Sequence, residues 1–226
     1  ARAQARAATP HGSGVGRIIG EPDGGLLPPF SFLYGGGCSD DFLAGWPCVQ
    51  THVAAGERSS HVWQDPADGL QVRLECRCYD DFPVVEFTAW LTNTGDRNTP
   101  LITDFHGADL LIPAIPADAL AIHSVTGDYY SARGYEPYVL PLPPGTEEQI
   151  APVGGRGSNQ AFPYFNLRTA FGGLIVAVGW PGQWQATFTR GANGQLRVRA
   201  GQQQVRLVLR PGETIRGPLI ALLRWE

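Results

Sequence analysis

The 226-residue sequence contains no lysine and no methionine, and it has only four cysteines. All of its positive charge is therefore arginine, and 17 arginines are scattered against 21 acidic residues for a net charge of −4. Domains that bind nucleic acid carry a clustered basic surface that offsets phosphate charge. The sequence has no such cluster, so we expect no nucleic-acid partner.

Long apolar runs and periodic helix patterns are also missing. No apolar segment approaches the roughly 20 residues that a membrane-spanning helix requires, so we expect no membrane partner. Hydrophobic residues make up 43% of the chain and charged residues 17%, which is ordinary for a globular protein with a core. The 29 glycines and 19 prolines are typical of short strands joined by turns.

Several segments alternate apolar and polar residues, as a β-strand with one buried face does. The clearest are 70–78, 83–95, 194–201 and 203–213, and 218–225 is one more strand segment, which is largely apolar. Turn residues separate these segments at 66–69, 192–194 and 211–213. The pattern predicts an all-β fold, a large antiparallel β-sandwich with few or no helices, over residues 28–226. Residues 1–27, rich in Gly, Ala, Arg and Pro, are predicted to form a tail or an arm.

The cysteines favour buried thiols over a metal site. Cys76 and Cys78 lie two residues apart, so on a strand they share one face with Leu70, Val72 and Leu74. The C-x-C spacing is not that of a zinc site, and no histidine pair has ligand spacing. A disulfide between Cys38 and Cys48 is an alternative in an oxidising compartment.

The start of the sequence bears on localisation. The A-x-A triplets within residues 1–10 resemble the end of a signal peptide and indicate export to the periplasm or outside the cell. An arbitrary start of the sequence would look the same.

Catalytic motifs are absent from the sequence. It has no G-x-S-x-G elbow and no phosphate-binding loop. The paired carboxylates Asp40-Asp41 and Asp80-Asp81 are neighbours in sequence and are better explained as solvated turns. A glycosidase needs two carboxyl groups about 5–10 Å apart in a cleft, and no specific pair stands out. We therefore predict no catalytic residue, no metal and no cofactor in this chain.

Two polar, aromatic segments are the candidates for ligand or interface contacts. GDYYSARGYEPY (127–138) and GGRGSNQAFPYFNL (154–167) combine aromatic rings with groups that hydrogen-bond hydroxyls, a mixture found in sugar sites. The candidate residues are Asp128, Tyr129, Tyr130, Arg156, Ser158, Asn159, Gln160 and Trp184. Alternatively, the tyrosines cover a sandwich edge or an interface while their hydroxyls stay in water.

The order of several motifs resembles one known family. PPFSFLYGG, YDDFPVVEFTAWLTNTG, GGRGSNQAFPYFNL, GGLIVAVGWPGQW and LRPGETIRGPLIALLRW follow one another along the chain. Together they resemble the N-terminal β-supersandwich domain of family-36 glycoside hydrolases, the α-galactosidase family. The most specific parts are W-x-G-Q-W from Trp180 to Trp184 and PGE-x-I-R-x-P from Pro211 to Pro218. The resemblance covers about Pro28 to Trp225.

The resemblance implies an accessory role. Family members place an Asp nucleophile and an Asp acid/base on a (β/α)₈ barrel that follows the sandwich, so no residue here inherits a catalytic role. The chain would support that C-terminal barrel, contribute to a homo-oligomer and form part of the rim of a site for α-galactoside-like carbohydrate. Its full-length parent would be a retaining glycoside hydrolase. A large apolar patch should then mark where the barrel docks.

The loop 154–167 corresponds to a family segment near G-x-(S/T)-S-(H/N)-x-x-x-P-F. Ser158, Asn159 and Pro163 match it, whereas the residue after the glycines does not. We expect the polar residues of this loop to face a neighbouring domain or subunit, and Trp180 and Trp184 to pack beneath it. The alternatives are a free-standing β-sandwich that acts as a structural, self-assembling subunit, or a carbohydrate-binding module.

Overall fold

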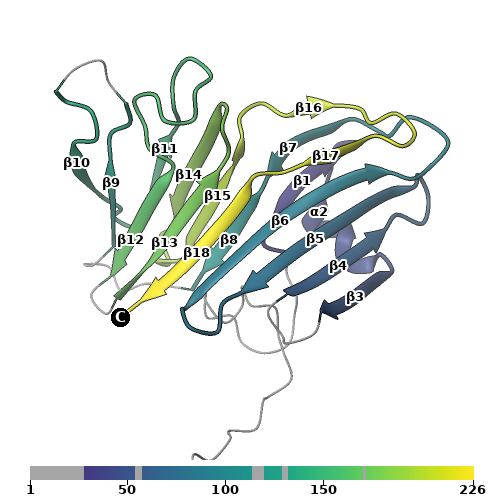
Figure 1. The fold of residues 1–226 in the computed structure, drawn as a ribbon, viewed down its shortest axis with the longest axis horizontal. Coiled ribbons are helices and arrows are strands. Elements are labelled where there is room, and N and C mark those ends of the chain that lie inside the picture. Colours follow the sequence, from purple (N-terminus) through teal and green to yellow (C-terminus); the bar gives the residue numbers. More distant parts are fainter. Residues whose placement is uncertain (1–27, 54–57, 114–119, 129–131, 170–171) are drawn as a thin grey trace, which may run out of the picture.

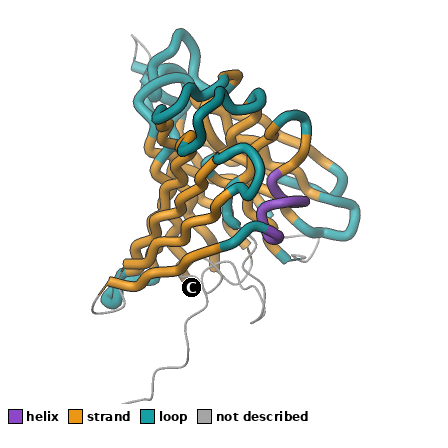
Figure 2. Tube along the Cα trace, turned by 90° about the vertical axis from the view of Figure 1, so that its right-hand side faces the viewer, coloured by secondary structure: helices purple, strands orange, loops and turns teal. Residues whose placement is uncertain are grey.

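The computed structural model describes residues 28–53, 58–113, 120–128, 132–169 and 172–226 (Figure 1). Strands dominate this part of the chain (Figure 2), and one short helical segment consists of α2 (Ser39–Phe42) and a 3₁₀ turn, η1 (Leu43–Gly45). No helix among these residues is long and apolar enough to span a membrane. The predicted tail, residues 1–27, lies outside the described residues.

A large antiparallel sheet forms the first layer, running from edge strand β10 to edge strand β3 (Figure 1). Its order is β10-β9-β12-β13-β18-β6-β5-β4-β3, and β17 pairs with β6. The strands are β3 (Cys48–Val53), β4 (Arg58–Gln64), β5 (Leu70–Cys78), β6 (Val84–Asn93), β9 (Ala121–Val125), β10 (Pro137–Pro141), β12 (Tyr164–Thr169), β13 (Gly172–Gly179), β17 (Thr214–Arg216) and β18 (Leu219–Trp225).

Two four-stranded antiparallel sheets form the second layer, behind the large sheet in Figure 1. One has the order β16-β7-β1-β2 and the other β11-β14-β15-β8. Their strands are β1 (Ser31–Tyr34), β2 (Gly37–Cys38), β7 (Ile102–His106), β8 (Ala108–Ile112), β11 (Thr146–Ile150), β14 (Trp184–Arg190), β15 (Leu196–Gln202) and β16 (Arg206–Leu207). The predicted antiparallel β-sandwich is confirmed.

One apolar core lies between the layers. Phe165 of β12 packs edge-to-face on Trp184 and Phe188 of β14, with ring centroids 5.7 and 5.1 Å apart. Phe30 packs on Trp63 of β4 in the same way, at 6.0 Å. Each fully buried side chain of this size contributes about 1.5–3 kcal/mol, so these contacts across the layers stabilise the sandwich.

The alternating segments at 70–78 and 83–95 behave as predicted. Leu70, Val72, Leu74 and Cys76 are buried on the core side of β5. The predicted outward face of β6 carries Trp90, whose ring lies under two guanidinium groups, those of Arg73 at 5.0 Å and Arg216 at 5.7 Å. Cation–π contact explains how an outward tryptophan is stabilised there.

Some local predictions need correction. The segment 203–213 is largely irregular, with only Arg206–Leu207 in a strand, because Leu209 and Thr99 hydrogen-bond each other outside any ladder. Asp40 and Asp41 lie in α2 instead of in a solvated turn, although both are exposed. The possible disulfide is not formed, since Cys38 and Cys48 are both free thiols.

The second layer bends where β7 gives way to β8. Gly107 alone separates these strands, and Gly201 of β15 lies against it. A Cβ atom on Gly201 would come within 2.7 Å of the Phe105 carbonyl oxygen and 2.9 Å of the Gly107 nitrogen. Only glycine permits this approach of backbone to backbone. The bend therefore joins the two four-stranded sheets, and the candidate site lies along it.

Candidate functional site

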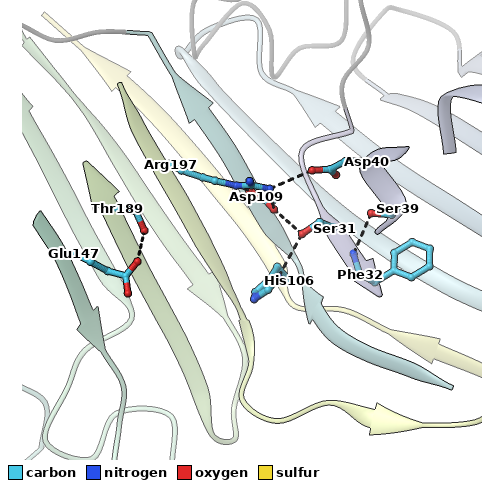
Figure 3. A network of polar contacts seen from close by, with 9 residues as sticks. All are labelled: Ser31, Phe32, Ser39, Asp40, His106, Asp109, Glu147, Thr189 and Arg197. Atoms are coloured by element: carbon cyan, nitrogen blue, oxygen red, sulfur yellow. Dashed lines mark hydrogen bonds and ion pairs between the residues drawn. The ribbon is translucent and has the colours of Figure 1, made fainter. Parts of the chain in front are cut away.

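A polar groove of about 440 Å³ lies on the outer face of the second layer, where its two sheets meet (Figure 3). On β14 the residues that face the core are Trp184, Ala186 and Phe188, so the alternate residues Gln185 and Thr187 face the groove. The other strands place polar side chains there in the same way. Besides these two, the lining includes Asp40, His106, Asp109, Gln149, Arg197 and Arg199. The groove, as we call it below, is thus built from the polar sides of several amphipathic strands.

An ion pair between Arg197 and Asp109 forms one wall of the groove. Arg197 Nε lies 2.7 Å from Asp109 Oδ1, and Nη2 lies 2.7 Å from Oδ2. The same Nη2 lies 3.1 Å from an oxygen of Asp40 on α2. The Asp109 side chain is only 6% exposed, whereas that of Arg197 is 40% exposed. The hydrogen bonds to Asp109 raise the pKa of Arg197 further above its usual range, so the guanidinium stays charged.

Ser31 and His106 complete this wall (Figure 3). The Ser31 hydroxyl donates to Asp109 Oδ2 at 2.5 Å and lies 3.3 Å from His106 Nδ1. Burial lowers the pKa of His106, which favours the neutral ring. Because Ser31 gives its one proton to Asp109, the Nδ1–H of His106 must donate to Ser31, and Nε2 is then an acceptor.

Other side chains of the groove lining are available to form hydrogen bonds with a ligand. Glu147 accepts a hydrogen bond from Thr189 at 2.7 Å. The side chains of Gln149 and Arg199, by contrast, have no hydrogen-bond partner among the residues that the structure describes. No three His, Cys, Asp or Glu side chains in the described ranges come together as a metal site would require. The groove can therefore offer donors and acceptors to a polar ligand.

The residues predicted from sequence lie elsewhere, at a corner where residues 126–128 meet 158–161. The Asp128 N–H donates to the Ser158 carbonyl at 2.6 Å, and the Gln160 N–H donates to the Asp128 carbonyl at 3.2 Å. Asn159 Nδ2 donates to the Val153 carbonyl at 2.7 Å. The structure thus brings these four residues together through their backbones. Tyr129 and Tyr130 lie outside the described residues.

Trp184 supports this corner from inside. Its ring is fully buried, and its Nε1–H donates to the Gly157 carbonyl at 2.6 Å. A fully buried ring cannot contact a ligand on the surface, so its role is to hold the loop from beneath. Among the members of the predicted set that the structure describes, Arg156 and Gln160 are the exposed ones.

Sequence reasoning missed the groove because its residues are distant in the chain. Ser31, His106, Asp109 and Arg197 are brought together across separations of 75 to 88 residues. The sequence did contain one indication of the groove. Arg197 and Arg199 alternate with Leu196 and Val198, which are buried, so the two arginines share one outward face. Alternation alone cannot distinguish a ligand-facing row from a solvated one.

Comparisons with known proteins point to one group of enzymes. No family model matches the sequence, and no curated protein is similar to it. The α-galactosidase from Lactobacillus brevis is similar in structure, with a TM-score of 0.64 and 16% identity over 88% of this chain and 29% of that chain. The GH36 α-galactosidase AgaB from Geobacillus stearothermophilus is also similar in structure, with a TM-score of 0.63 and 18% identity over 87% of this chain and 30% of that chain.

At these identities the similarity establishes the fold. This chain has the fold of one part of GH36 α-galactosidases and spans less than a third of their length. The resemblance drawn from motif order is confirmed at that level. A smaller protein, Slr1438 from Synechocystis sp. PCC 6803, is also similar, with a TM-score of 0.52 and 10% identity over 89% of this chain and 75% of that chain.

Proposed function

We propose that this chain is the non-catalytic, N-terminal accessory domain of an α-galactosidase-like glycoside hydrolase. The observation that carries the proposal is the pattern of coverage: 86–88% of this chain matches only 27–30% of GH36 α-galactosidase chains. A fold that accounts for nearly all of one chain and a minor part of the other fits a supporting domain. The catalytic barrel would then be a partner domain.

The state of the groove's carboxylates supports a non-catalytic role. A retaining glycosidase uses two carboxyl groups about 5–5.5 Å apart, of which one must be protonated when catalysis begins. Both oxygens of Asp109 already accept hydrogen bonds, from Arg197 and from Ser31, and Arg197 also contacts Asp40. A carboxyl group whose two oxygens are engaged in this way is poorly placed to give a proton to a substrate.

The outer face of the large sheet supports a docked partner domain. Strand register places Ile175 and Ala177 of β13 opposite Leu223 and Ala221 of β18, all four on the side away from the core. Tyr164 on the neighbouring strand is 53% exposed. Contiguous apolar surface of this kind marks interaction sites. We assign the barrel to this face, and we assign Arg156 and Gln160 to the rim of the sugar site or to an oligomer contact.

A hydrolase assay tests the non-catalytic role. The purified 226-residue chain should not hydrolyse p-nitrophenyl α-galactoside, because the groups for bond cleavage would lie on the barrel. Turnover that persists through rigorous purification and follows the protein peak would overturn the proposal.

A free-standing sandwich is the second candidate. The match to Slr1438, of which this chain covers 75%, favours it, because it shows the fold in a chain with little else attached. In that case the domain would act by binding or assembly.

A further inference from the structure

We propose that the groove is a saccharide-binding site on the sandwich itself, which takes a neutral polyhydroxyl ligand. The proposal does not depend on the proposed accessory role. Its volume of about 440 Å³ lies within the range of about 300–1,000 Å³ that is usual for small-ligand sites.

A single row of side chains across four strands forms the floor of the groove. Register pairs Gln149 with Thr187, Thr187 with Arg199, and Arg199 with Asp109. Because neighbouring strands lie about 4.8 Å apart, the row is about 14 Å long. It presents an amide, a hydroxyl, a guanidinium and a carboxylate in order. Such a row can address several hydroxyl groups of one sugar.

One end of the row is rigid before any ligand arrives. Asp109 is 6% exposed and is fixed by Arg197 on one side and by Ser31 on the other. A binding group held in place by its neighbours loses little freedom on binding, which favours affinity. Arg199 lies next to Asp109 in the row and Gln149 lies at the other end, and the side chains of both have no hydrogen-bond partner among the residues described here.

The charge of the groove argues against other ligand classes. Four carboxylates, those of Asp40, Asp104, Asp109 and Glu147, face two guanidiniums, those of Arg197 and Arg199. This excess of negative charge disfavours phosphate and other anions. The described residues provide no cluster of three metal ligands.

A neutral hydroxyl suits this lining. Each hydroxyl can donate one hydrogen bond and accept two, so it matches a surface that mixes carboxylate, amide, guanidinium and neutral imidazole. His106 adds an acceptor nitrogen, Nε2, to this set, because burial lowers its pKa and favours the neutral ring, and its Nδ1–H donates to the Ser31 hydroxyl. The geometry thus favours a polyol over a charged ligand.

Calorimetric titration of the chain with D-galactose, D-glucose and raffinose tests the proposal. At least one sugar should bind saturably. Arg199→Ala should weaken that binding about tenfold, the usual effect of losing a hydrogen bond that involves a charged group. Gln149→Ala removes a neutral, exposed amide and should weaken the binding by a smaller factor, about threefold. Thr187→Val, which keeps the shape of the side chain, should also weaken it. Arg168→Ala is the matched control, since this exposed arginine lies on β12 in the other layer.

Unfolding midpoints of the variants should match the parent, which separates lost binding from lost fold. Absence of saturable binding by all three sugars would overturn the proposal. So would unchanged affinity in both Arg199→Ala and Gln149→Ala, or tighter binding of inorganic phosphate than of any sugar. None of these results bears on the hydrolase assay, so the two proposals fail separately.

Discussion

Arg197 of β15 holds Asp109 of β8 at two points, with each of two nitrogens 2.7 Å from a different carboxylate oxygen. The pair is asymmetric in exposure: Asp109 is nearly buried, whereas the guanidinium reaches solvent. The pair therefore stabilises the folded sandwich, and it also fixes one end of the row of side chains that we propose binds a ligand. A bidentate pair fixes the orientation of both side chains as well as their charge.

Replacing Arg197 should destabilise the sandwich much more than replacing Asp40, the second carboxylate that Arg197 contacts. Arg197→Ala leaves the buried Asp109 carboxylate without its cation, and we expect a loss of about 2–4 kcal/mol, reduced from the fully buried case because water reaches Arg197. Asp40→Ala removes only an exposed contact and should cost less than about 1 kcal/mol. Urea unfolding measures both. Equal losses would show that the Arg197–Asp109 contact is not a stabilising pair.

Stability should fall as the solution becomes mildly acidic. His61 is 1% exposed, neither ring nitrogen has a hydrogen-bond partner among the described residues, and burial followed by the nearby His52 lowers its pKa below the usual 6.5. The unfolded chain therefore takes up a proton before the folded one does. Full stability is present above about pH 6.5 and is lost as the pH falls toward the folded pKa.

Urea unfolding at pH 7.5 and pH 5.5 measures this slope. His61→Phe should reduce the slope without abolishing it, because burial also lowers the pKa of His106. The account of His61 is wrong if the variant and the parent lose the same stability between the two pH values.

Close packing at the corner where residues 126–128 meet 158–161 can be tested with one added methyl group. A Cβ atom on Gly127 would lie 2.0 Å from the Ser158 carbonyl oxygen and 2.6 Å from the Ala161 nitrogen. Gly127→Ala must therefore displace backbone, and we expect a loss of about 3 kcal/mol or more. Gly45→Ala is the control, since open space surrounds that position and its stability should change little. Similar unfolding midpoints for the two variants would contradict the packed corner.

The four cysteines should all titrate as thiols in denaturant, because all four are free. In the native protein Cys48 should react first with a thiol reagent, since it is exposed, although desolvation raises its pKa and slows the reaction. Cys76 should be inert, because burial raises its pKa to about 12. Cys48→Ser should remove the fast phase. A total of two thiols in denaturant would instead show a disulfide.

Local patterns in the sequence predicted the strands that lie in the middle of the layers. In β5 the apolar and polar residues alternate over all nine residues, and β18 is a largely apolar run; the tertiary contacts of both strands agree with these patterns. The segment 203–213 alternates as well, but there Leu209 hydrogen-bonds with side-chain and backbone groups of Thr99 and with the Asn93 side chain. Sequence periodicity cannot reveal such partners.

The groove could not be predicted because register creates it. The pairing of Gln149 with Thr187 and of Arg199 with Asp109 depends on how β11, β14, β15 and β8 align, and a shift of one residue would turn each side chain to the core. The corner between residues 126–128 and 158–161, by contrast, combines two segments that the sequence analysis selected, 127–138 and 154–167. The exposure of its side chains, including the burial of Trp184, needed the structure.

The mass of the intact natural protein tests the central claim most directly. Capture with an antibody raised against this chain, followed by mass spectrometry without digestion, gives that mass. The account predicts a value far above the 24.4 kDa of this chain, with room for a catalytic barrel. A mass near 24.4 kDa would contradict it and would make the free-standing sandwich the correct description.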